Sequence, residues 1–194
     1  MAQFKAFSQG VEVYGQTVLS LVAGMSAMPS FKATALRILS ANGIDDPKPD
    51  QWYSQQAWLS AFREIAEKVG ALTLHSIGKK IPENAQWPPS VNSIETALAS
   101  IDVAYHMNHR LNGKVMFDPA TGKMTEGIGH YGFEKVGEKK AKIECRNPYP
   151  SDFDRGILEA VAKKFAPSGA FVTVSVTDDG RKNGGDSSTY SVEW

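Results

Sequence analysis

The spacing of the apolar residues changes at Asn112, and this change constrains the fold more strongly than any other feature of the sequence. Before Asn112, apolar residues recur at intervals of three and four, which is typical of amphipathic helices. After it, they lie in short segments separated by glycines and charged turns, as antiparallel strands and hairpins require. Because helices and strands are segregated along the chain, the sequence predicts an α+β fold and not an α/β fold with parallel crossovers.

Residues 1–112 are predicted to form a mainly helical half. We expect helices over residues 31–43, 54–70 and 93–109, the first two ended by glycine and the third capped by Ser93. Residues 72–81 can continue as a further helix before the prolines that follow. Residues 11–25 are rich in β-branched side chains and are broken by Gly15, so a short hairpin or an extended arm is expected there.

Residues 113–194 are predicted to form an antiparallel α+β half. Short strands are expected within residues 113–147, a helix over residues 151–166, and a closing hairpin over residues 170–194. Ser151 can cap this helix, and Asp154 stands three residues later in a capping-box-like position. We therefore predict a single domain over residues 1–194, in which the helical half packs on a sheet with the order β-β-α-β-β.

Composition excludes several classes of partner. Lysine plus arginine number 21 and aspartate plus glutamate number 21, so no excess of positive charge favours nucleic acid or an anionic membrane. No apolar run approaches the roughly 20 residues of a spanning helix, and the first residues lack the features of a signal peptide. The single cysteine, Cys145, excludes an intrachain disulfide. We expect a cytoplasmic protein with neither nucleic acid nor membrane as a partner.

The stretch SIDVAYHMNHR, residues 100–110, gathers more polar chemistry than any other short segment. On a helix that advances about 100° per residue, Tyr105 falls within the apolar stripe and His109 lies near its edge. His106 lies to one side of the stripe, four residues after Asp102. One interpretation makes His106 an exposed partner of Asp102 and His109 a cation at the helix end. The other makes either histidine a metal ligand that a nearby carboxylate orients.

Other candidate residues are more isolated. In RNPYPSDFDRG, two prolines hold Tyr149 in an extended entry to the next helix, and helix capping accounts for the serine and both aspartates. His75 is expected in the core or at a helix edge, His130 on a strand, and Cys145 as an inert buried side chain. No Ser/His/Asp order, Walker motif or zinc-protease motif is present.

Four segments of the chain carry a family resemblance. They are FREIAEKVGALTLHSIGKKI, ALASIDVAYHMNHR, PYPSDFDRGILEAVAKKF and GGDSSTYSVEW. Together they resemble, over roughly residues 62–194, the superfamily that joins haem nitric oxide/oxygen binding (H-NOX-like) domains to 4-vinyl reductase domains. The second segment is similar to the helix that carries the iron-ligating histidine of the haem-binding domains. The third is similar to the segment that holds their Tyr-x-Ser-x-Arg haem-propionate motif.

The resemblance implies a pocket between the helical half and the sheet that receives a small apolar or aromatic molecule, or haem. It implies His106 or His109 as the iron ligand if haem is bound, although an alignment on Asp102 puts the ligand position at Tyr105. Tyr149 and Ser151 match the propionate motif, whereas Phe153 occupies its arginine position and Arg155 follows two residues later.

The leading prediction is a cytoplasmic, non-enzymatic sensor domain that binds a small hydrophobic ligand and passes its signal to a separate protein. Tyr105, His106, His109 and Tyr149 are the expected polar anchors, and Trp58 and Phe62 are expected to line the pocket. The cofactor is unknown, with haem as a candidate. Two alternatives stay open: a small enzyme whose histidine general base is oriented by Asp102, and a dimerisation or scaffold module that forms a homodimer.

Overall fold

The computed structural model describes residues 3–25 and 29–194. The helices are α1 (Gly15–Gly24), α2 (Pro29–Ala41), α3 (Gln55–Lys80), η1 (Ile81–Asn84), α4 (Ile94–Met107), α5 (Ser151–Phe165) and η2 (Gly180–Asn183). The strands are β1 (Val11–Tyr14), β2 (Trp52–Ser54), β3 (His109–Leu111), β4 (Lys114–Val115), β5 (Phe117–Asp118), β6 (Lys123–Met124), β7 (His130–Gly137), β8 (Lys140–Arg146), β9 (Thr173–Asp178) and β10 (Ser187–Glu193).

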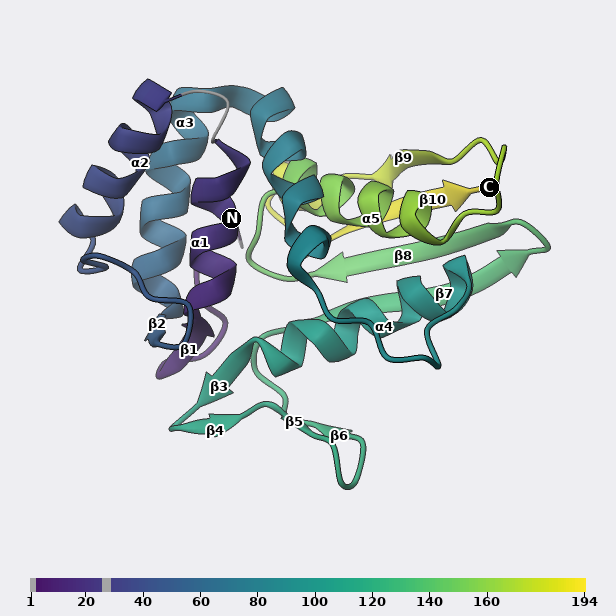
Figure 1. Cartoon of the computed structure of the whole chain (residues 1–194), viewed down its shortest axis with the longest axis horizontal. Coiled ribbons are helices and arrows are strands. Elements are labelled where there is room, and N and C mark those ends of the chain that lie inside the picture. The colour runs from purple at the N-terminus through teal and green to yellow at the C-terminus, as the bar shows by residue number, and fades with distance from the viewer. Residues whose placement is uncertain (1–2, 26–28) are drawn as a thin grey trace.

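Helices α1 and α2 and the first part of α3 lie on the left of Figure 1, and together with the rest of α3 and with α4 they make up the predicted helical half. The predicted end of the first helix is confirmed, because Gly43 has φ 81° after α2 and the Ile44 amide bonds to the Leu39 carbonyl. The predicted break at Gly70 is confirmed as well. Gly70 has φ 73° and divides α3 into two helical arms, the second of which corresponds to the helix expected over residues 72–81 and ends one residue earlier, at Lys80.

The prediction of a hairpin or extended arm near the N-terminus is wrong. Residues 11–14 form β1, and Gly15 then begins α1, whose Val18 and Leu21 are fully buried. Gly15 marks a close approach and not a turn, since a Cβ at this position would lie 1.9 Å from the Lys48 carbonyl oxygen. Burial of the apolar face of α1 overrides the weak β propensity of its residues.

A small sheet ties the N-terminal segment to the end of α4. Its strand order is β2-β1-β3-β4, so β1 is an inner strand. β1 pairs antiparallel with both β2 and β3, and Val13 lies opposite His109. β1 therefore packs beside His109 and Arg110, at the end of the SIDVAYHMNHR segment.

The larger sheet has the strand order β7-β8-β10-β9, and all its neighbouring strands are antiparallel. Because α5 joins β8 to β9, the predicted β-β-α-β-β unit and the α+β class are both confirmed. Figure 1 shows α5 along the sheet and α4 beside β7. Alternate residues of β8 are buried, and among them Cys145 has a thiol pKa that burial raises well above its usual value.

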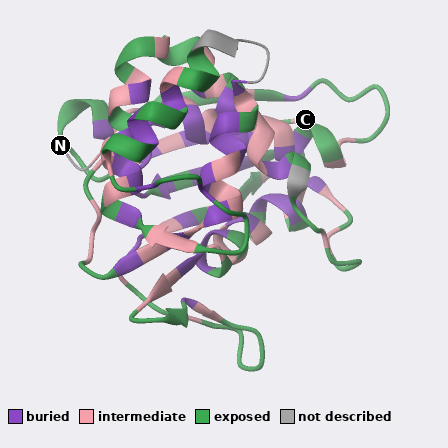
Figure 2. Ribbon diagram, turned by 60° about the vertical axis from the view of Figure 1, so that its left-hand side comes forward, coloured by how far each residue is buried: buried purple, intermediate pink, exposed green. Residues whose placement is uncertain are grey.

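The helical half rests on α5 through a contact between helix backbones. A Cβ at Gly78 of α3 would lie 2.0 Å from the Phe153 carbonyl oxygen, and a Cβ at Gly156 of α5 would lie 2.1 Å from the His75 carbonyl oxygen. The imidazole of His75 stands at the edge of this contact and bonds to Glu159 at 2.8 Å. One continuous apolar core surrounds the crossing, as the buried residues in Figure 2 show.

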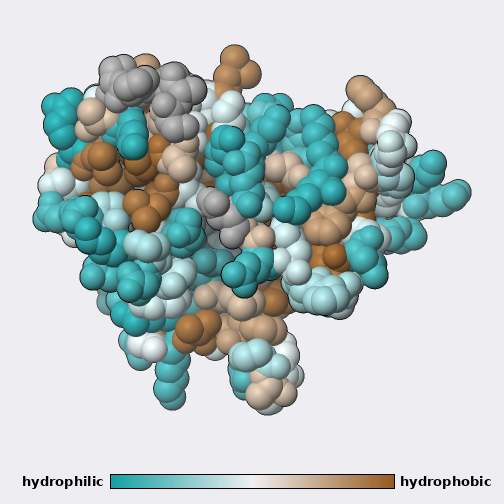
Figure 3. Space-filling view, in the orientation of Figure 1, coloured by the Kyte–Doolittle hydropathy of each residue, from teal (hydrophilic) through white to brown (hydrophobic). Residues whose placement is uncertain are grey.

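Some apolar side chains remain on the surface of the helical half. Phe31 and Leu36 of α2 are exposed, and Figure 3 shows apolar residues on the surface over the N-terminal helices.

Within residues 3–25 and 29–194, none of the helices has the length and apolar character needed to cross a membrane.

Candidate functional site

The end of α4 brings together five of the six predicted site residues. α4 starts as predicted at Ser93, whose hydroxyl accepts from the Thr96 amide in a capping box. It ends two residues before the expected boundary, and His109 lies in β3. In the interior Tyr105 and His109 contact the ring of Tyr149. Tyr149 in turn lies beside Phe62, and Phe62 lies beside Trp58.

Hydrogen bonds fix the orientation of the His109 imidazole. Its Nδ1 lies 2.7 Å from the Tyr105 carbonyl oxygen, and its Nε2 lies 3.1 Å from the Tyr149 hydroxyl. Because a carbonyl oxygen can only accept, Nδ1 carries the proton and the Tyr149 hydroxyl donates to Nε2. The Tyr105 hydroxyl donates to the Ile128 carbonyl at 2.7 Å.

Burial sets the charge of these groups. Burial lowers the pKa of His109 to about 4. The hydrogen bond to the Tyr105 carbonyl favours the charged imidazole and would raise this pKa, but its effect is smaller. His109 is therefore neutral at pH 7, and the interpretation of it as a cation at the helix end is wrong. Burial also raises the pKa of the Tyr105 and Tyr149 hydroxyls, so both stay protonated.

Two side chains of α3 bring unpartnered polar atoms to the same place. Gln55 is fully buried, and neither its amide oxygen nor its amide nitrogen has a hydrogen-bond partner in the described part of the chain. Nε1 of the buried Trp58 likewise makes no hydrogen bond of good geometry there, although Trp58 is close enough to the Tyr149 hydroxyl to lower its pKa against the effect of burial. Gln55 is close enough to the hydroxyls of Tyr105 and Tyr149 to lower both pKa values against the effect of burial. We call Gln55, Trp58, Tyr105, His109 and Tyr149 the inner cluster.

Aromatic rings enclose the inner cluster. The Phe62 ring lies 5.2 Å from that of Trp58 and 5.1 Å from that of Phe153, measured between centroids. The Tyr131 ring covers Tyr105 at 5.3 Å. These are distances of direct ring contact. Side chains therefore fill the region between the helical half and the sheet where we expected the pocket.

His106, the sixth predicted residue, lies on another side of α4. It is fully buried, so the interpretation of it as an exposed residue is wrong, and its ring centroid lies 4.9 Å from that of His130 on β7. Asp102 is closer to His130, with 2.9 Å between Oδ2 and Nδ1, than to His106, with 3.5 Å between Oδ1 and Nδ1. We call Asp102, His106 and His130 the outer cluster.

A buried arginine holds the backbone at Tyr149. Arg181 of η2 donates to the Tyr149 carbonyl at 2.7 Å and lies 2.8 Å from the Asp154 carboxylate. Burial alone would lower the pKa of this guanidinium, but Asp154 beside it contributes to holding that pKa above its ordinary value. Asp154 is thus the partner of a buried cation, and the capping-box role predicted for it is wrong.

The other residues that match the propionate motif also have protein partners. Ser151 is the first residue of α5 and not its cap, and its hydroxyl lies 3.1 Å from that of Ser188. Phe153 is buried against Phe62, and Arg155 pairs with Asp152 at 3.4 Å. The motif position itself therefore offers no guanidinium, and Arg155 keeps one unpartnered atom, Nε, within the described part of the chain.

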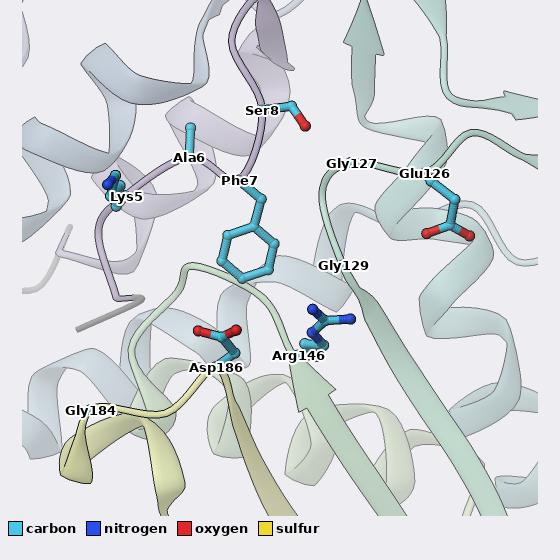
Figure 4. Close-up of a pocket in the computed structure, with 10 residues that line it drawn as sticks. All are labelled: Lys5, Ala6, Phe7, Ser8, Glu126, Gly127, Gly129, Arg146, Gly184 and Asp186. Atoms are coloured by element: carbon cyan, nitrogen blue, oxygen red, sulfur yellow. The ribbon is translucent and has the colours of Figure 1, made fainter.

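A ligand-sized pocket lies away from the inner cluster. Its volume is about 550 Å³, and Figure 4 shows Phe7 projecting into it above Asp186 and Arg146. Its other walls come from the N-terminal segment and from the glycine-containing turns before β7 and β10: Lys5, Ala6, Ser8, Glu126, Gly127, Gly129 and Gly184. Two cations and two anions line it, so the pocket has no excess charge that would select an ion.

Comparison with solved structures identifies the architecture. A member of the H-NOX family solved to probe haem distortion shares 16% identity with a TM-score of 0.63, over 93% of this chain and 94% of its own. An oxygen-binding H-NOX domain related to soluble guanylate cyclases shares 16% identity with a TM-score of 0.60, over 92% of this chain and 93% of its own. The fold is H-NOX-like.

An H-NOX protein from S. oneidensis, in the Fe(II) ligation state, is similar to the same extent, with 12% identity, a TM-score of 0.61, and coverage of 93% and 95%. No protein-family model and no curated protein matches the sequence. At these identities the likeness establishes the H-NOX-like fold, which confirms that part of the predicted resemblance.

The interior of this H-NOX-like fold does not fit a porphyrin as it is packed. A ligating imidazole needs iron about 2 Å from its free nitrogen, but Nε2 of His109 faces the Tyr149 hydroxyl. The rings of Phe62, Tyr149 and Phe153 occupy the space beside it, and Phe153 takes the place of the motif arginine. Haem could enter only if these side chains moved aside.

Three functional candidates escaped the sequence-based prediction. Gln55 carried no signal beyond its place in the first turn of a helix. Arg181 lies in a turn that its glycines mark only as a hairpin connection. His130 was expected on a strand facing either way, and its contact with Asp102 depends on the packing of β7 against α4.

Proposed function

We propose that this chain is a ligand-binding sensor domain with an H-NOX-like fold, and that the aromatic rings around the inner cluster move apart to admit a small polar molecule there. The observation that supports this proposal is the set of unpartnered polar atoms of Gln55 and Trp58 in an aromatic interior. Folded proteins leave few buried polar groups without partners, and each costs about 1–3 kcal/mol. A bound molecule that supplies the missing partners would offset this cost.

The inner cluster favours a ligand of a few heavy atoms that carries both a donor and an acceptor. Trp58 and the Gln55 amide nitrogen can donate to it, and the Gln55 amide oxygen can accept from it. Phe62 and Tyr149 would enclose its apolar part. Small amides and alcohols have this chemistry. The roles predicted for Trp58, Phe62, Tyr105, His109 and Tyr149 are retained in this proposal, whereas His106 lies outside the binding site.

A thermal-shift experiment with matched variants tests this site. Acetamide and imidazole serve as probes for the wild-type chain, for Gln55→Leu, and for Gln56→Leu, which makes the same change at an exposed neighbouring position. We expect the probes to raise the melting temperature of the wild-type chain and of Gln56→Leu but not of Gln55→Leu. Equal shifts in the two variants, or no shift in the wild-type chain, would contradict the proposal.

We propose further that this chain functions without haem, with its interior filled by side chains as described above. Similar H-NOX structures were solved to examine haem, and haem is the cofactor that the fold suggests first. Haem added to the purified chain is expected to give no Soret band of a histidine-ligated protein. A Soret band that His109→Ala or His106→Ala abolishes, and that His75→Ala retains, would establish haem binding and refute the haem-free proposal.

A second candidate function is general-base catalysis at His130. The 2.9 Å contact between Asp102 and His130 Nδ1 favours it, because such a carboxylate orients a catalytic imidazole. Nε2 of His130, which would act as the base, instead lies 3.1 Å from Glu126. A substrate screen in which the wild-type chain shows no turnover above His130→Ala would eliminate this candidate.

We propose that a separate signalling protein reads the bound state, and that a homodimer is the candidate assembly. Strands β7 and β9 are the edges of the larger sheet, and Val136 and Val176 are exposed on them. Because residues 11–24 are part of the core, sedimentation should use the full chain and compare it with Val136→Lys. A wild-type dimer that this substitution dissociates supports pairing through β7, and a monomeric wild-type chain refutes it.

A further inference from the structure

The outer cluster joins α4 to the first strand of the larger sheet through three side chains that can bind metals. Asp102 and His106 stand four residues apart on α4, and His130 begins β7. One potential ligand atom from each residue lies within 4.8 Å of the others. A tetrahedral zinc ion with bonds of about 2.1 Å separates its ligand atoms by about 3.4 Å. Oδ2 of Asp102 lies 2.9 Å from Nδ1 of His130, a separation that an ion between them would widen by about 0.5 Å. Nδ1 of His106 donates to the Asp102 carbonyl oxygen, so Nε2 is the nitrogen that this residue can offer to an ion.

Other groups already orient the three side chains. The Tyr131 amide donates to Asp102 Oδ1 at 2.9 Å. Glu126 lies 3.1 Å from Nε2 of His130, on the side of the ring away from Asp102. A carboxylate on the second nitrogen of an imidazole is the usual support for a metal-binding histidine, since it fixes the tautomer and the ring plane. With Glu126 holding Nε2, Nδ1 of His130 is the nitrogen available to a metal.

Only one of the two ring nitrogens of His106 makes a hydrogen bond in the described part of the chain. Its Nδ1 lies 2.8 Å from the Asp102 carbonyl oxygen, but its Nε2 has no hydrogen-bond partner in the described ranges although the ring is fully buried. A buried imidazole nitrogen normally bonds to protein, water or metal. The unpartnered nitrogen therefore points independently to a missing group beside the cluster.

We propose that Asp102, His106 and His130 bind a divalent transition-metal ion of the zinc class. Two imidazoles and one carboxylate form a donor set that suits Zn²⁺. Asp102 and His130 are partly exposed, which gives a fourth ligand, water, access to the ion. The ion would fasten α4 to β7 directly outside Tyr105. This site is separate from the proposed ligand site and does not depend on it.

A proton is the main competitor of the metal. Partial burial lowers the pKa of His130, but the carboxylates of Asp102 and Glu126 more than offset this effect and raise it. Without metal, a protonated His130 would bridge the two carboxylates as an ion pair. The experiment must therefore distinguish a metal site from a salt bridge.

The experiment is a zinc titration of the full chain after removal of metals, in competition with a chromogenic chelator at pH 7.5. We expect one Zn²⁺ per chain. His130→Gln should weaken binding by more than about tenfold, and Asp102→Asn should do the same. His75→Gln is the matched control, because His75 also pairs with a carboxylate, Glu159, but lies outside the cluster. It should bind zinc like the wild-type chain.

Native mass and a visible spectrum with Co²⁺ provide independent readouts, and circular dichroism verifies that each variant is folded. Co²⁺ in a tetrahedral site absorbs visible light much more strongly than hydrated Co²⁺, and we expect this absorption in the wild-type chain and in His75→Gln only. Three results would overturn the proposal: no zinc bound by the wild-type chain, unchanged affinity in folded His130→Gln, or equal weakening in His75→Gln, which would indicate adventitious binding to histidines.

Discussion

Replacing Arg181 with methionine should cost this chain a large part of its stability. The guanidinium is fully buried and lies 2.8 Å from the carboxylate of Asp154, which is also fully buried. Methionine fills a similar volume but leaves this carboxylate without a countercharge. Removing one partner of a buried ion pair typically costs about 3–5 kcal/mol. The carbonyl of Tyr149 also loses a donor, which adds about 1 kcal/mol.

The expected loss of about 4–6 kcal/mol is comparable with the whole stability of many domains, roughly 5–15 kcal/mol. Urea denaturation followed by circular dichroism measures it. The control is Arg155→Met, since the Arg155 side chain keeps 31% exposure and makes only a long contact of 3.4 Å with Asp152. Such pairs are worth about 0–1 kcal/mol.

A double-mutant cycle separates the ion pair from the packing of the arginine stem. Arg181→Met combined with Asp154→Asn should cost at least about 1.5 kcal/mol less than the sum of the single variants, because the double variant buries no unpaired charge. Additive costs would show that the two groups do not interact. A loss in Arg181→Met no larger than that in Arg155→Met would refute the role of Arg181 as the anchor of the Tyr149 segment.

Three further outcomes follow from the packing. The folded pKa of His109, about 4, lies below its unfolded value of about 6.5, so the free energy of unfolding should fall by up to about 3 kcal/mol from pH 7 to pH 4. Urea titrations should show a weaker fall in His109→Phe, and an identical fall would contradict the assignment. Gly156→Ala should lower the melting temperature although alanine favours helices by about 1 kcal/mol, because its Cβ would collide with the His75 carbonyl oxygen; an increase would refute the close crossing. Burial raises the pKa of Glu159, but the effect of Lys163, Lys79 and His75 in the opposite direction is larger, so the pKa falls to about 2. Glu159 should therefore stay ionised in an NMR titration until well below pH 4, and a midpoint at or above its ordinary value would contradict this.

The helices and the larger sheet could be predicted because their signals are local. Apolar spacing and the glycines at positions 43 and 70 define helices without reference to other segments, and alternation defines the closing hairpin. The prediction at Gly15 was wrong because the role of this glycine depends on a distant segment. Its lack of a side chain serves a contact with Lys48, and no local pattern distinguishes that use of glycine from a turn.

The candidate site could be predicted only in part. The apolar stripe of α4 correctly placed Tyr105 in the interior, but the helix has a second covered side that its stripe does not reveal. His106 is buried there because β7 packs against α4. Asp154 fits a capping pattern locally, yet its partner Arg181 comes from a turn far along the chain. Long-range contacts of this kind decide the roles of polar residues and leave no periodic signal.

The break at Gly70 brings the two arms of α3 to different parts of the molecule. Its first arm carries Gln55, Trp58 and Phe62 at the inner cluster, and its second arm carries Gly78 against α5. A Cβ at Gly70 would meet nothing within 4 Å, so the positive φ of the break, and not a close approach, accounts for the glycine. Both arms are held in the core through buried side chains, among them Trp58 and Phe62 in the first and Leu74 and Ile77 in the second. The break thus allows one helix to serve two contacts that a straight helix would have to divide between two elements.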